Sequence, residues 1–430
     1  MLSAFRNAFK VPDLRKKILF TLGVLAVYRL GCHIPTPGAD YSAIQQAIEQ
    51  TGSDQQGIYT LINLFSGGAL TQFAIFALGI MPAITSQIIM QLLTVVIPKL
   101  EAWQKEGEAG YKKIQQWTRY LTVTLALMQS TAMTVMANRG QLVQGIKIIP
   151  DRNFTPPRIA LTVLSLTAGT ALIMWMGELI TQRGIGNGMS LIIFASIIAR
   201  LPVEGSTILS VNGLPLFIFV LLLGFGIIVA VVLVEQAQRR IPVQYAKRMV
   251  GRRMYGGTST YIPLKVNQAG VIPIIFASSL LYLPALAASI VRWDWLQKFV
   301  NSTFAKGSGP VYIISYFVLI IFFAYFYTAI TFNPLDVADN MKKYGGFIPG
   351  IRPGRPTAEY LDHILTRITL PGSLFLGSIA ILPFLALAAW GINSFPFGGT
   401  AILIVVGVAL ETMKQIDSQL LMRNYEGFLR

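Results

Sequence analysis

The side chains that could carry out chemistry are few in this sequence and stand far apart. The two histidines, His33 and His363, lie near no other obvious ligand, so a histidine or cysteine metal site is not expected. Cys32 is the only cysteine, which excludes a disulfide within the chain. The sequence offers no pair of carboxylates for acid–base catalysis and no Ser/His/Asp set that could converge. These absences argue against an enzyme, and we expect neither catalytic residues nor a cofactor.

One glycine-rich tract, GIGNGMS at 184–190, invites comparison with a nucleotide-binding loop. A phosphate-binding loop follows a strand and ends in Lys-Ser or Lys-Thr, and this tract has neither feature. The tract therefore predicts a turn at the start of a helix.

The composition indicates the elements that must position any functional residues. Of the 430 residues, 53% are hydrophobic and 13% are charged, and the mean hydropathy is +0.58. A soluble protein carries about 25% charged residues, so lipid is the solvent for most of this chain. Ten segments are apolar enough to cross a bilayer as helices. They are 18–36, 72–97, 119–137, 159–180, 184–202, 214–235, 270–291, 311–332, 368–390 and 398–413.

Basic residues show how these spans are oriented. Most of the 35 Lys and Arg residues precede the first span, follow the last, or lie in loops after even-numbered spans. By the positive-inside rule, both termini are cytoplasmic. Residues 1–17 are basic and amphipathic, which is typical of a segment at the membrane surface. No cleavage pattern of a signal peptide follows them.

Two long loops on the cytoplasmic side, at about 236–269 and 333–367, exceed what orientation requires. In the first, alternation of basic residues with Tyr, Ile and Val predicts a short hairpin that contains Gly256 and Gly257. Its charge fits an orientation signal, a docking platform for RNA or an acidic protein, or an anionic lipid site, and the residues leave these open. The basic residues of this loop are Arg239, Arg240, Lys247, Arg248, Arg252, Arg253 and Lys265.

The 19 acidic residues avoid the middle of every predicted span. Glu178, Glu235 and Glu411 stand near cytoplasmic ends, and the others lie in loops or flanks. Buried carboxylates within the membrane mark proton relays and many coupled-ion sites. Their absence argues against a proton-driven transporter.

The stretch LFSGGALTQFAIFALGIMP, at 64–82, combines an apolar composition with helix-breaking residues. Irregular backbone at membrane depth is tolerated only where protein buries it or it lines a cavity. We therefore expect a short re-entrant segment at about 58–70 and a full span that begins near Thr71 or Gln72. An ordinary loop followed by a glycine-rich helix fits the pattern equally well.

This stretch and six other motifs resemble the SecY/Sec61 alpha family of protein-conducting channels, and the resemblance covers essentially the whole chain. The motifs that carry the resemblance are long and occur in the family's order. They are IPTPG at 34–38, NLFSGGALTQFAIFALGIMPAITSQIIMQLLTVV from residue 63, EGEAGYKKIQQWTRY at 106–120, TQRGIGNGMSLIIFA at 181–195, YAKRMVGRRMYGGTSTYIPLKVNQAGVIPIIFASS at 245–279, FYTAITFNPLDVADNMKKYGGFIPGIRPGRPTAEYL at 326–361 and FGGTAILIVVGVALE at 397–411.

The resemblance implies an all-α membrane protein of ten transmembrane helices. Two inverted, pseudo-symmetric halves, 18–202 and 203–413, would surround an hourglass-shaped pore, and 414–430 would form a cytoplasmic tail. The re-entrant segment would be a plug that closes the external funnel. Its centre, carried over by position, is Phe65, Ser66, Gly67 and Gly68.

The family's pore constriction is a ring of aliphatic side chains, which would block ions by dewetting a narrow neck. Methionine at position 189 departs from the more usual isoleucine and makes the seal more pliable. Taken alone, each of these residues would also fit ordinary packing against lipid or the core. The ring falls on Ile80, Ile84, Met189, Ile193, Ile275 and Ile404.

A lateral gate between spans 2 and 3 on one side and 7 and 8 on the other is also implied. Gln87, Gln91 and Asn267 lie near those faces and would ease opening through hydrogen bonds. Polar contacts of this kind between membrane helices also serve as simple adhesion, worth ~0.6 kcal/mol each.

The function implied is passage of unfolded secretory polypeptides across the bacterial cytoplasmic membrane and lateral release of hydrophobic segments into lipid. The family's partners are the subunits SecE and SecG, the motor ATPase SecA, the translating ribosome, and the preprotein with its signal peptide. Arginines suit contacts with rRNA phosphates or motor carboxylates. The docking residues we expect are Arg239, Arg240, Arg252, Arg253 and Arg352. The alternatives are a secondary transporter with broken helices and an insertase or scaffold without a pore.

Overall fold

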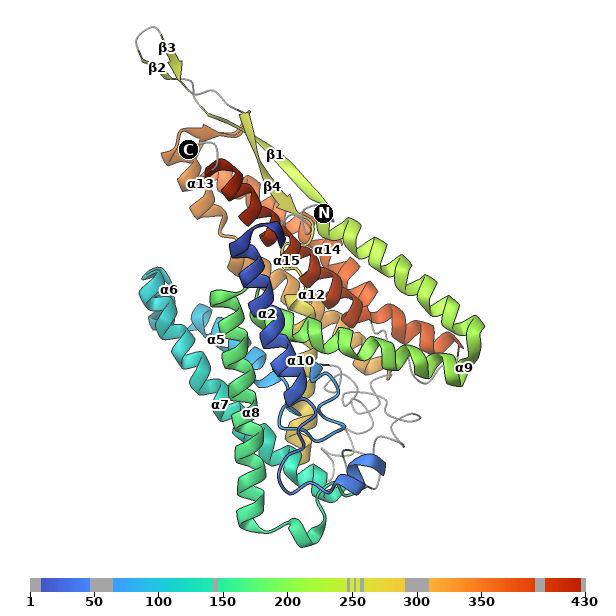
Figure 1. Cartoon of the computed structure of the whole chain (residues 1–430). Coiled ribbons are helices and arrows are strands. Elements are labelled where there is room, and N and C mark those ends of the chain that lie inside the picture. The colour runs from blue at the N-terminus through green and yellow to red at the C-terminus, as the bar shows by residue number, and fades with distance from the viewer. Residues whose placement is uncertain are drawn as a thin grey trace.

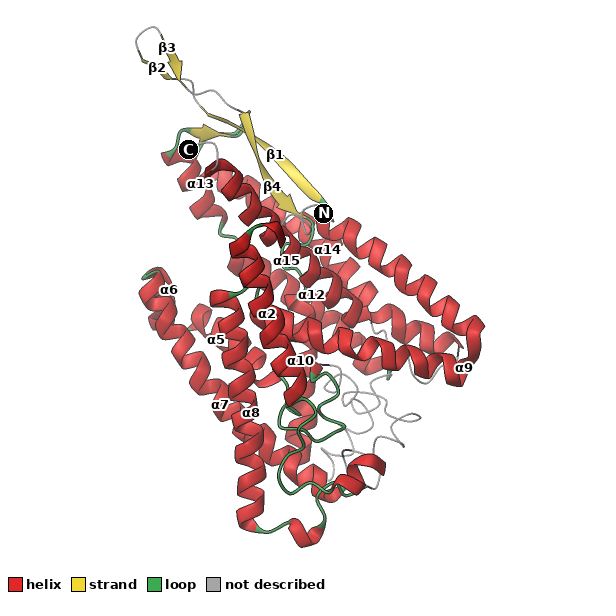
Figure 2. Ribbon diagram, viewed as in Figure 1, coloured by secondary structure: helices red, strands yellow, loops and turns green. Residues whose placement is uncertain are grey.

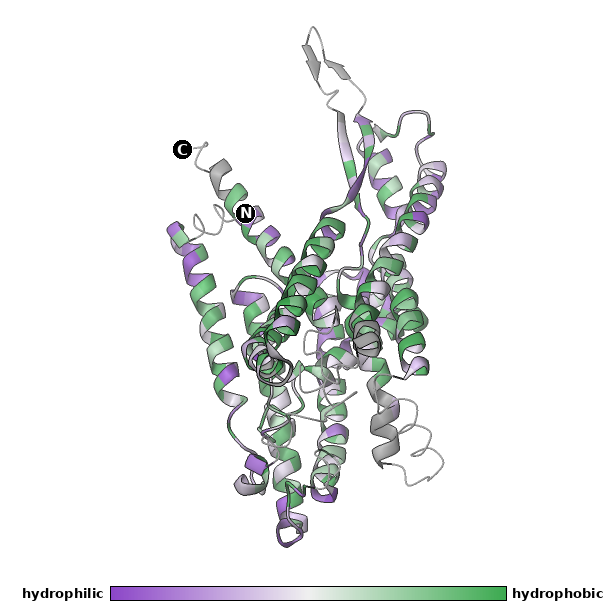
Figure 3. Cartoon of the chain, turned by 90° about the vertical axis from the view of Figure 1, so that its right-hand side faces the viewer, coloured by the Kyte–Doolittle hydropathy of each residue, from purple (hydrophilic) through white to green (hydrophobic). Residues whose placement is uncertain are grey.

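The computed structural model describes residues 9–46, 65–140, 142, 146–245, 248–250, 253–255, 259–290, 309–390 and 399–426. These residues form a bundle of long helices with a small group of strands at one end (Figures 1 and 2). In Figure 3 apolar residues dominate the middle of the bundle, while polar residues gather toward its ends. This pattern is typical of helices that cross a bilayer.

The helices of the N-terminal half overlap the predicted spans but differ from them at several boundaries. They are α2 (Pro12–Gly31), α5 (Met81–Val96), α6 (Pro98–Lys105), α7 (Glu108–Arg139), α8 (Pro156–Arg183) and the start of α9 (Gly188–Gln236). α5 and α6 meet at an angle of 99°. Gly213, with φ 78°, breaks α9 into parts that cover 188–210 and 213–236, so α9 supplies both the fifth and the sixth predicted span.

The C-terminal half contains α10 (Ile272–Ile290), α12 (Pro310–Thr331), α13 (Pro334–Lys343), α14 (Arg355–Trp390) and α15 (Gly399–Glu426). α10 packs on α12, α12 on α14, and α14 on α15. The two halves meet where α10 packs against α5 and α7. A helical segment thus overlaps each of the ten predicted spans within the described residues. By length and hydropathy, six helices of these residues are long and apolar enough to cross a membrane, or seven if α5 and α6 form one bent span.

The start of α2 lies beside the end of the chain. α2 begins at Pro12, six residues before the predicted span, so part of segment 1–17 belongs to the first helix. Leu14 packs in a small cluster with Ile185 and Ile416, and Lys17 donates to Gln419 at 3.3 Å. The start of α2 and the end of α15 lie toward the strand-bearing end of the molecule (Figure 1).

The strands come from both long loops, which are far apart in the sequence and were not predicted to pair. β1 (Gln238–Tyr245) pairs antiparallel with β4 (Ser259–Lys265) and with β5 (Gly346–Phe347), in the order β4-β1-β5. β2 (Arg248–Val250) and β3 (Arg253–Tyr255) form a hairpin beyond them. The predicted hairpin is confirmed, while Gly256 and Gly257 lie outside the described residues.

The described residues contain two large hydrophobic clusters. The larger joins helices of both halves at the centre of the bundle. The smaller lies under the sheet and includes Ile241, Leu264 and Leu361. We call β1, β4, β5, α13 and the first turns of α14 the sheet platform. The platform therefore has an apolar core of its own.

Candidate functional site

The six residues predicted to form the ring, which we call the waist, lie on elements of both halves and belong to, or pack against, the central hydrophobic cluster. Ile80 directly precedes α5 and Ile84 lies in its first turn, Met189 and Ile193 lie in the first turns of α9, Ile275 in α10, and Ile404 in α15. The exposed fraction is 1% for Ile80, 5% for Ile84, 1% for Ile193, 5% for Ile275 and 0% for Ile404. Met189 is half-buried and packs against the same central cluster.

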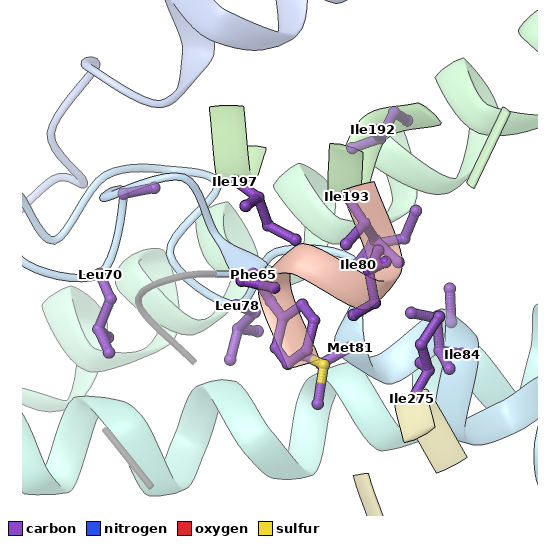
Figure 4. Packing of buried hydrophobic residues seen from close by; sticks show 14 of the residues in the cluster. Phe65, Leu70, Leu78, Ile80, Met81, Ile84, Ile192, Ile193, Ile197 and Ile275 are labelled. Atoms are coloured by element: carbon purple, nitrogen blue, oxygen red, sulfur yellow. The ribbon is translucent and has the colours of Figure 1, made fainter. Parts of the chain in front are cut away.

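Figure 4 shows how four of the waist side chains lie. Ile80, Ile84, Ile193 and Ile275 point into a shared apolar region, with Phe65 on the same side. Because these isoleucines come from both halves and are almost fully buried, apolar contacts fill the waist in this structure. Aliphatic contacts lack direction, so such a seal can yield without breaking a specific bond.

The segment Phe65–Ile80, which we call the turn segment, is irregular over more of its length than predicted. The helix of this span begins at Met81, so the expectation of a span starting near Thr71 or Gln72 is wrong. Gly79 has φ 58°, and Pro82, in the first turn of α5, lacks the N–H that an earlier helical turn would need. Both breakers were visible in the sequence.

Burial and hydrogen bonding make this irregular backbone tolerable at membrane depth. Phe65 is 1% exposed, and Ser66, Ala69 and Phe73 are 0% exposed. Gly67 and Gly68 have φ angles of 65° and 90°, which other residues rarely adopt. Residues 66–70 are non-helical and largely buried by protein, and 58–64 lie outside the described residues.

The end of α2 and the loop after it hold the turn segment by polar contacts. The Arg29 guanidinium donates from Nη1 to the Gly67 carbonyl at 2.6 Å. The backbone N–H and Oγ1 of Thr36 both donate to the Phe73 carbonyl, at 3.0 and 2.8 Å. Ile75 N donates to the Ile34 carbonyl at 2.9 Å. These bonds satisfy backbone groups that a helix would have satisfied internally.

The tract at 184–190 forms a helix start, as predicted. Asn187 is the N-cap of α9, and its side-chain oxygen accepts from the N–H groups of Met189 and Ser190 at 3.1 and 3.4 Å. A Cβ on Gly188 would lie 1.9 Å from the Gly177 carbonyl oxygen, so only glycine allows α8 and α9 to approach this closely. The tract therefore sets the position of Met189 and Ile193 at the waist.

The residues expected at the gate do not form one group. Gln87 is exposed and Gln91 half-buried, both on α5. Asn267 is 5% exposed and donates to Glu235 at 2.8 Å and to the Gly270 carbonyl at 3.1 Å. Asn267 is thus engaged within its own half, and in the described part of the chain its side chain is not hydrogen-bonded to either glutamine.

The arginines expected at the docking surface lie on or near the sheet platform. Arg239 and Arg240 are exposed on β1, and the Arg240 guanidinium carbon lies 4.8 Å from the Tyr261 ring centroid. Arg352 is exposed in the turn between β5 and α14. Its carbonyl accepts from the Thr357 hydroxyl at 2.9 Å, which fixes the backbone there. Arg253 lies in β3 at the tip, and Arg252 lies outside the described residues.

Sequence reasoning missed three polar residues beside the turn segment, namely Tyr28, Arg29 and Ser196. A basic residue inside a predicted span was a usable signal, because intramembrane charges usually have a role. Arg29 lies inside the first predicted span, 18–36, whose middle no acidic residue enters. Within the described ranges, no group of three His, Cys, Asp or Glu side chains could hold a metal ion.

Comparisons with known proteins agree with this architecture. A family model described as SecY matches residues 74–413. The protein translocase subunit SecY of Streptomyces scabiei is 60% identical over 448 residues, with 100% of both chains covered. A solved structure described as a protein conducting channel has a TM-score of 0.63 and 19% identity, over 93% of this chain and 91% of that chain. Sec61 in the canine ribosome-channel complex has a TM-score of 0.61 and 17% identity, with the same coverage. The structures show a shared fold, and the sequence matches show that the chain belongs to the SecY family.

Proposed function

We propose that this protein is a protein-conducting channel that passes unfolded polypeptides through its waist and releases hydrophobic segments sideways into lipid. It is not an enzyme, and a partner supplies the driving force. The observation that carries the proposal is the waist itself, where isoleucines of both halves close an apolar neck next to a buried, non-helical turn segment. A neck lined by aliphatic side chains excludes ions but holds no passing chain by directional bonds.

The contact between the halves supports a sideways exit. α10 meets α5 and α7 mainly through apolar residues of the central cluster. Separation of these helices would open the waist toward lipid. Gln87 and Gln91 lie on the α5 side of this proposed gate, and Asn267 lies in the connection between β4 and α10.

The sheet platform supports docking of a driving partner. It joins both long loops into one body and exposes Arg239, Arg240 and Arg352, while Arg253 lies in β3 of the hairpin. A motor ATPase of the SecA type would meet these residues through carboxylates, and a ribosome through rRNA phosphates. SecE, SecG and a preprotein with its signal peptide complete the proposed assembly.

The proposed location is the bacterial cytoplasmic membrane, with both termini in the cytoplasm. The second part of α9 exposes large apolar side chains such as Leu222, Phe225 and Leu233, as expected of a surface that faces lipid or a membrane subunit. The start of α2 and the end of α15 lie toward the same end of the bundle as the basic platform (Figure 1), which matches the positive-inside rule.

Site-specific crosslinking tests the proposal. A photo-reactive residue at Ile275 should form an adduct with a stalled secretory chain, whereas the same residue at the outward-facing Leu222 should not. Equal adducts at both positions, or none at Ile275, would contradict a central passage. Saturable uptake of a small solute into proteoliposomes, with no adduct, would instead indicate a secondary transporter.

A further inference from the structure

Arg29 lies where it can hold the turn segment closed. It occupies the last turn of α2, is half-buried, and donates from Nη1 to the Gly67 carbonyl at 2.6 Å. A hydrogen bond from an ionised donor is about twice as strong as a neutral one. The Gly67 carbonyl belongs to a residue at φ 65°, outside any helix, so it has no helical partner to return to.

The neighbours of Arg29 fit the turn segment against the same half of the protein. The Tyr28 and Ser196 hydroxyls lie 2.7 Å apart, and Ser196 donates its own proton to the Ile192 carbonyl at 2.8 Å, so Tyr28 is the donor. The Tyr28 ring stacks on Phe76 with centroids 5.7 Å apart. Through its hydroxyl and its ring, Tyr28 therefore connects α2 with both α9 and the turn segment.

The space around Gly67 is closed by these residues. A Cβ at Gly67 would lie 3.3 Å from the Ser196 Cα and 3.4 Å from the Arg29 Nη1. α2 and this part of α9 belong to the N-terminal half, as do the Thr36 and Ile34 groups that bond to Phe73 and Ile75. The turn segment is therefore attached to one half, while the waist it lies beside is built from both.

We propose that Arg29 is a positioning residue for the closed channel, because its hydrogen bond to Gly67 fastens the turn segment to the N-terminal half. When the halves separate, the turn segment stays with α2, and its release is a distinct step that breaks this bond. The inference rests on the proposed function, since it assigns a role in the seal of that passage.

Cys32 provides a native reporter for this step. Its side chain is 1% exposed, and its thiol lies 3.6 Å from the Ser66 carbonyl, directly against the turn segment. It is the only cysteine in the chain, so a membrane-impermeant maleimide reports on this one position. Labelling requires the turn segment to move away from α2.

The experiment compares variants of the full-length protein in proteoliposomes, with no motor or substrate present. Arg29→Gln should raise the Cys32 labelling rate and the resting ion conductance by roughly tenfold or more, as expected for loss of a charge-assisted hydrogen bond. Arg29→Lys keeps a cationic donor and should fall between Arg29→Gln and the unaltered protein. Arg139→Gln is the matched control, because Arg139 is an exposed arginine in the last turn of α7 and should change neither readout.

A second variant breaks the same contact from the other partner. Gly67→Ala forces a Cβ against Ser196 and Arg29, so it should also raise labelling and conductance. If the two substitutions act on one contact, labelling and conductance of the double variant should be only slightly higher than those of the more strongly affected single variant. Labelling and conductance equal to those of the unaltered protein in both single variants would overturn the proposal. A failure of the proposed function would appear separately, as a missing preprotein adduct at Ile275.

Discussion

The waist and the sheet platform differ in the kind of side chain that each would use for its proposed role. The waist buries aliphatic side chains, whereas the platform exposes arginines. The five isoleucines of the waist have exposed fractions of 0–5%, and Met189 is half-buried. Beside the waist, the Arg29 side chain donates to a backbone carbonyl of the turn segment. On the platform, apolar residues such as Ile241 and Leu361 are buried beneath a sheet whose arginines face outward. A seal needs contacts that yield, whereas a docking surface needs directional contacts on a fixed frame. Substitutions on the platform should therefore impair motor docking without opening the seal, and substitutions at the waist should open the seal without impairing docking.

The largest expected effect reverses a charge on the platform. Arg352→Glu should abolish motor-driven export, because disrupting a charge pair at an interface costs roughly 2–5 kcal/mol. The protein should remain inserted in the membrane, and its resting ion conductance should not change. Export of a preprotein into vesicles with a purified motor measures the loss.

The matched control for Arg352 lies three residues later. Arg355 is also exposed, but it pairs with Glu359 at 3.1 Å, one helical turn later in α14. Arg355→Glu should retain most export. Normal secretion by Arg352→Glu would refute the docking role, and a leak through that variant would break the separation between the regions.

A polar substitution at the waist should give the converse result. Ile80→Asn removes a fully buried aliphatic side chain and adds an amide that favours water in the neck. Burial of an isoleucine is worth about 1.5–3 kcal/mol, so the resting ion conductance should rise by about 10- to 100-fold. Planar-bilayer recordings measure this.

The companion control for Ile80 is Ile97→Asn, the same change at a position 39% exposed just after α5. The resting ion conductance of Ile97→Asn should equal that of the unaltered protein. Motor binding should be unaltered in both variants. Unchanged conductance in Ile80→Asn would mean that the waist does not form the ion barrier.

The contrast also explains what the sequence could predict. Spans such as α7 and α8 were predictable because each is a long local apolar run. The start of α5 at Met81 was not predictable in this way, because the apolar run continues from Thr71 through Gly79 and Pro82 without a break in composition. The pairing of Gln244 with Phe347 unites two distant loops, and no local pattern signals it.

The candidate site shows the same limit. The six waist positions came from the family resemblance. The structure places them in or against the central hydrophobic cluster, but isoleucine alone carries no sign of a pore. The Arg29 contact depends on a backbone carbonyl of Gly67, and no side-chain pattern reveals which carbonyl lacks a helical partner.

A smaller effect on channel function is expected when the platform loses part of its own apolar core. Leu361 is 0% exposed among Ile241, Leu264 and Ile364, and Leu361→Ala should destabilise the platform by roughly 2–5 kcal/mol. Limited proteolysis should then cut the strands faster. Ion conductance should not change, because none of these residues belongs to the central cluster. Leu370→Ala, at an exposed position on the same helix, is the control.

The smallest expected effect tests the connection between the regions. Asn267 lies between β4 and α10 and bonds to Glu235 at the end of α9, so it links the platform to the bundle that carries Ile275. Asn267→Ala should cost roughly 1–3 kcal/mol, because the half-buried Glu235 carboxylate loses a donor. If the regions are independent, the variant lowers thermal stability while conductance and motor affinity keep their values. If both shift together, Asn267 transmits docking to the waist, and the platform and the seal form one coupled device.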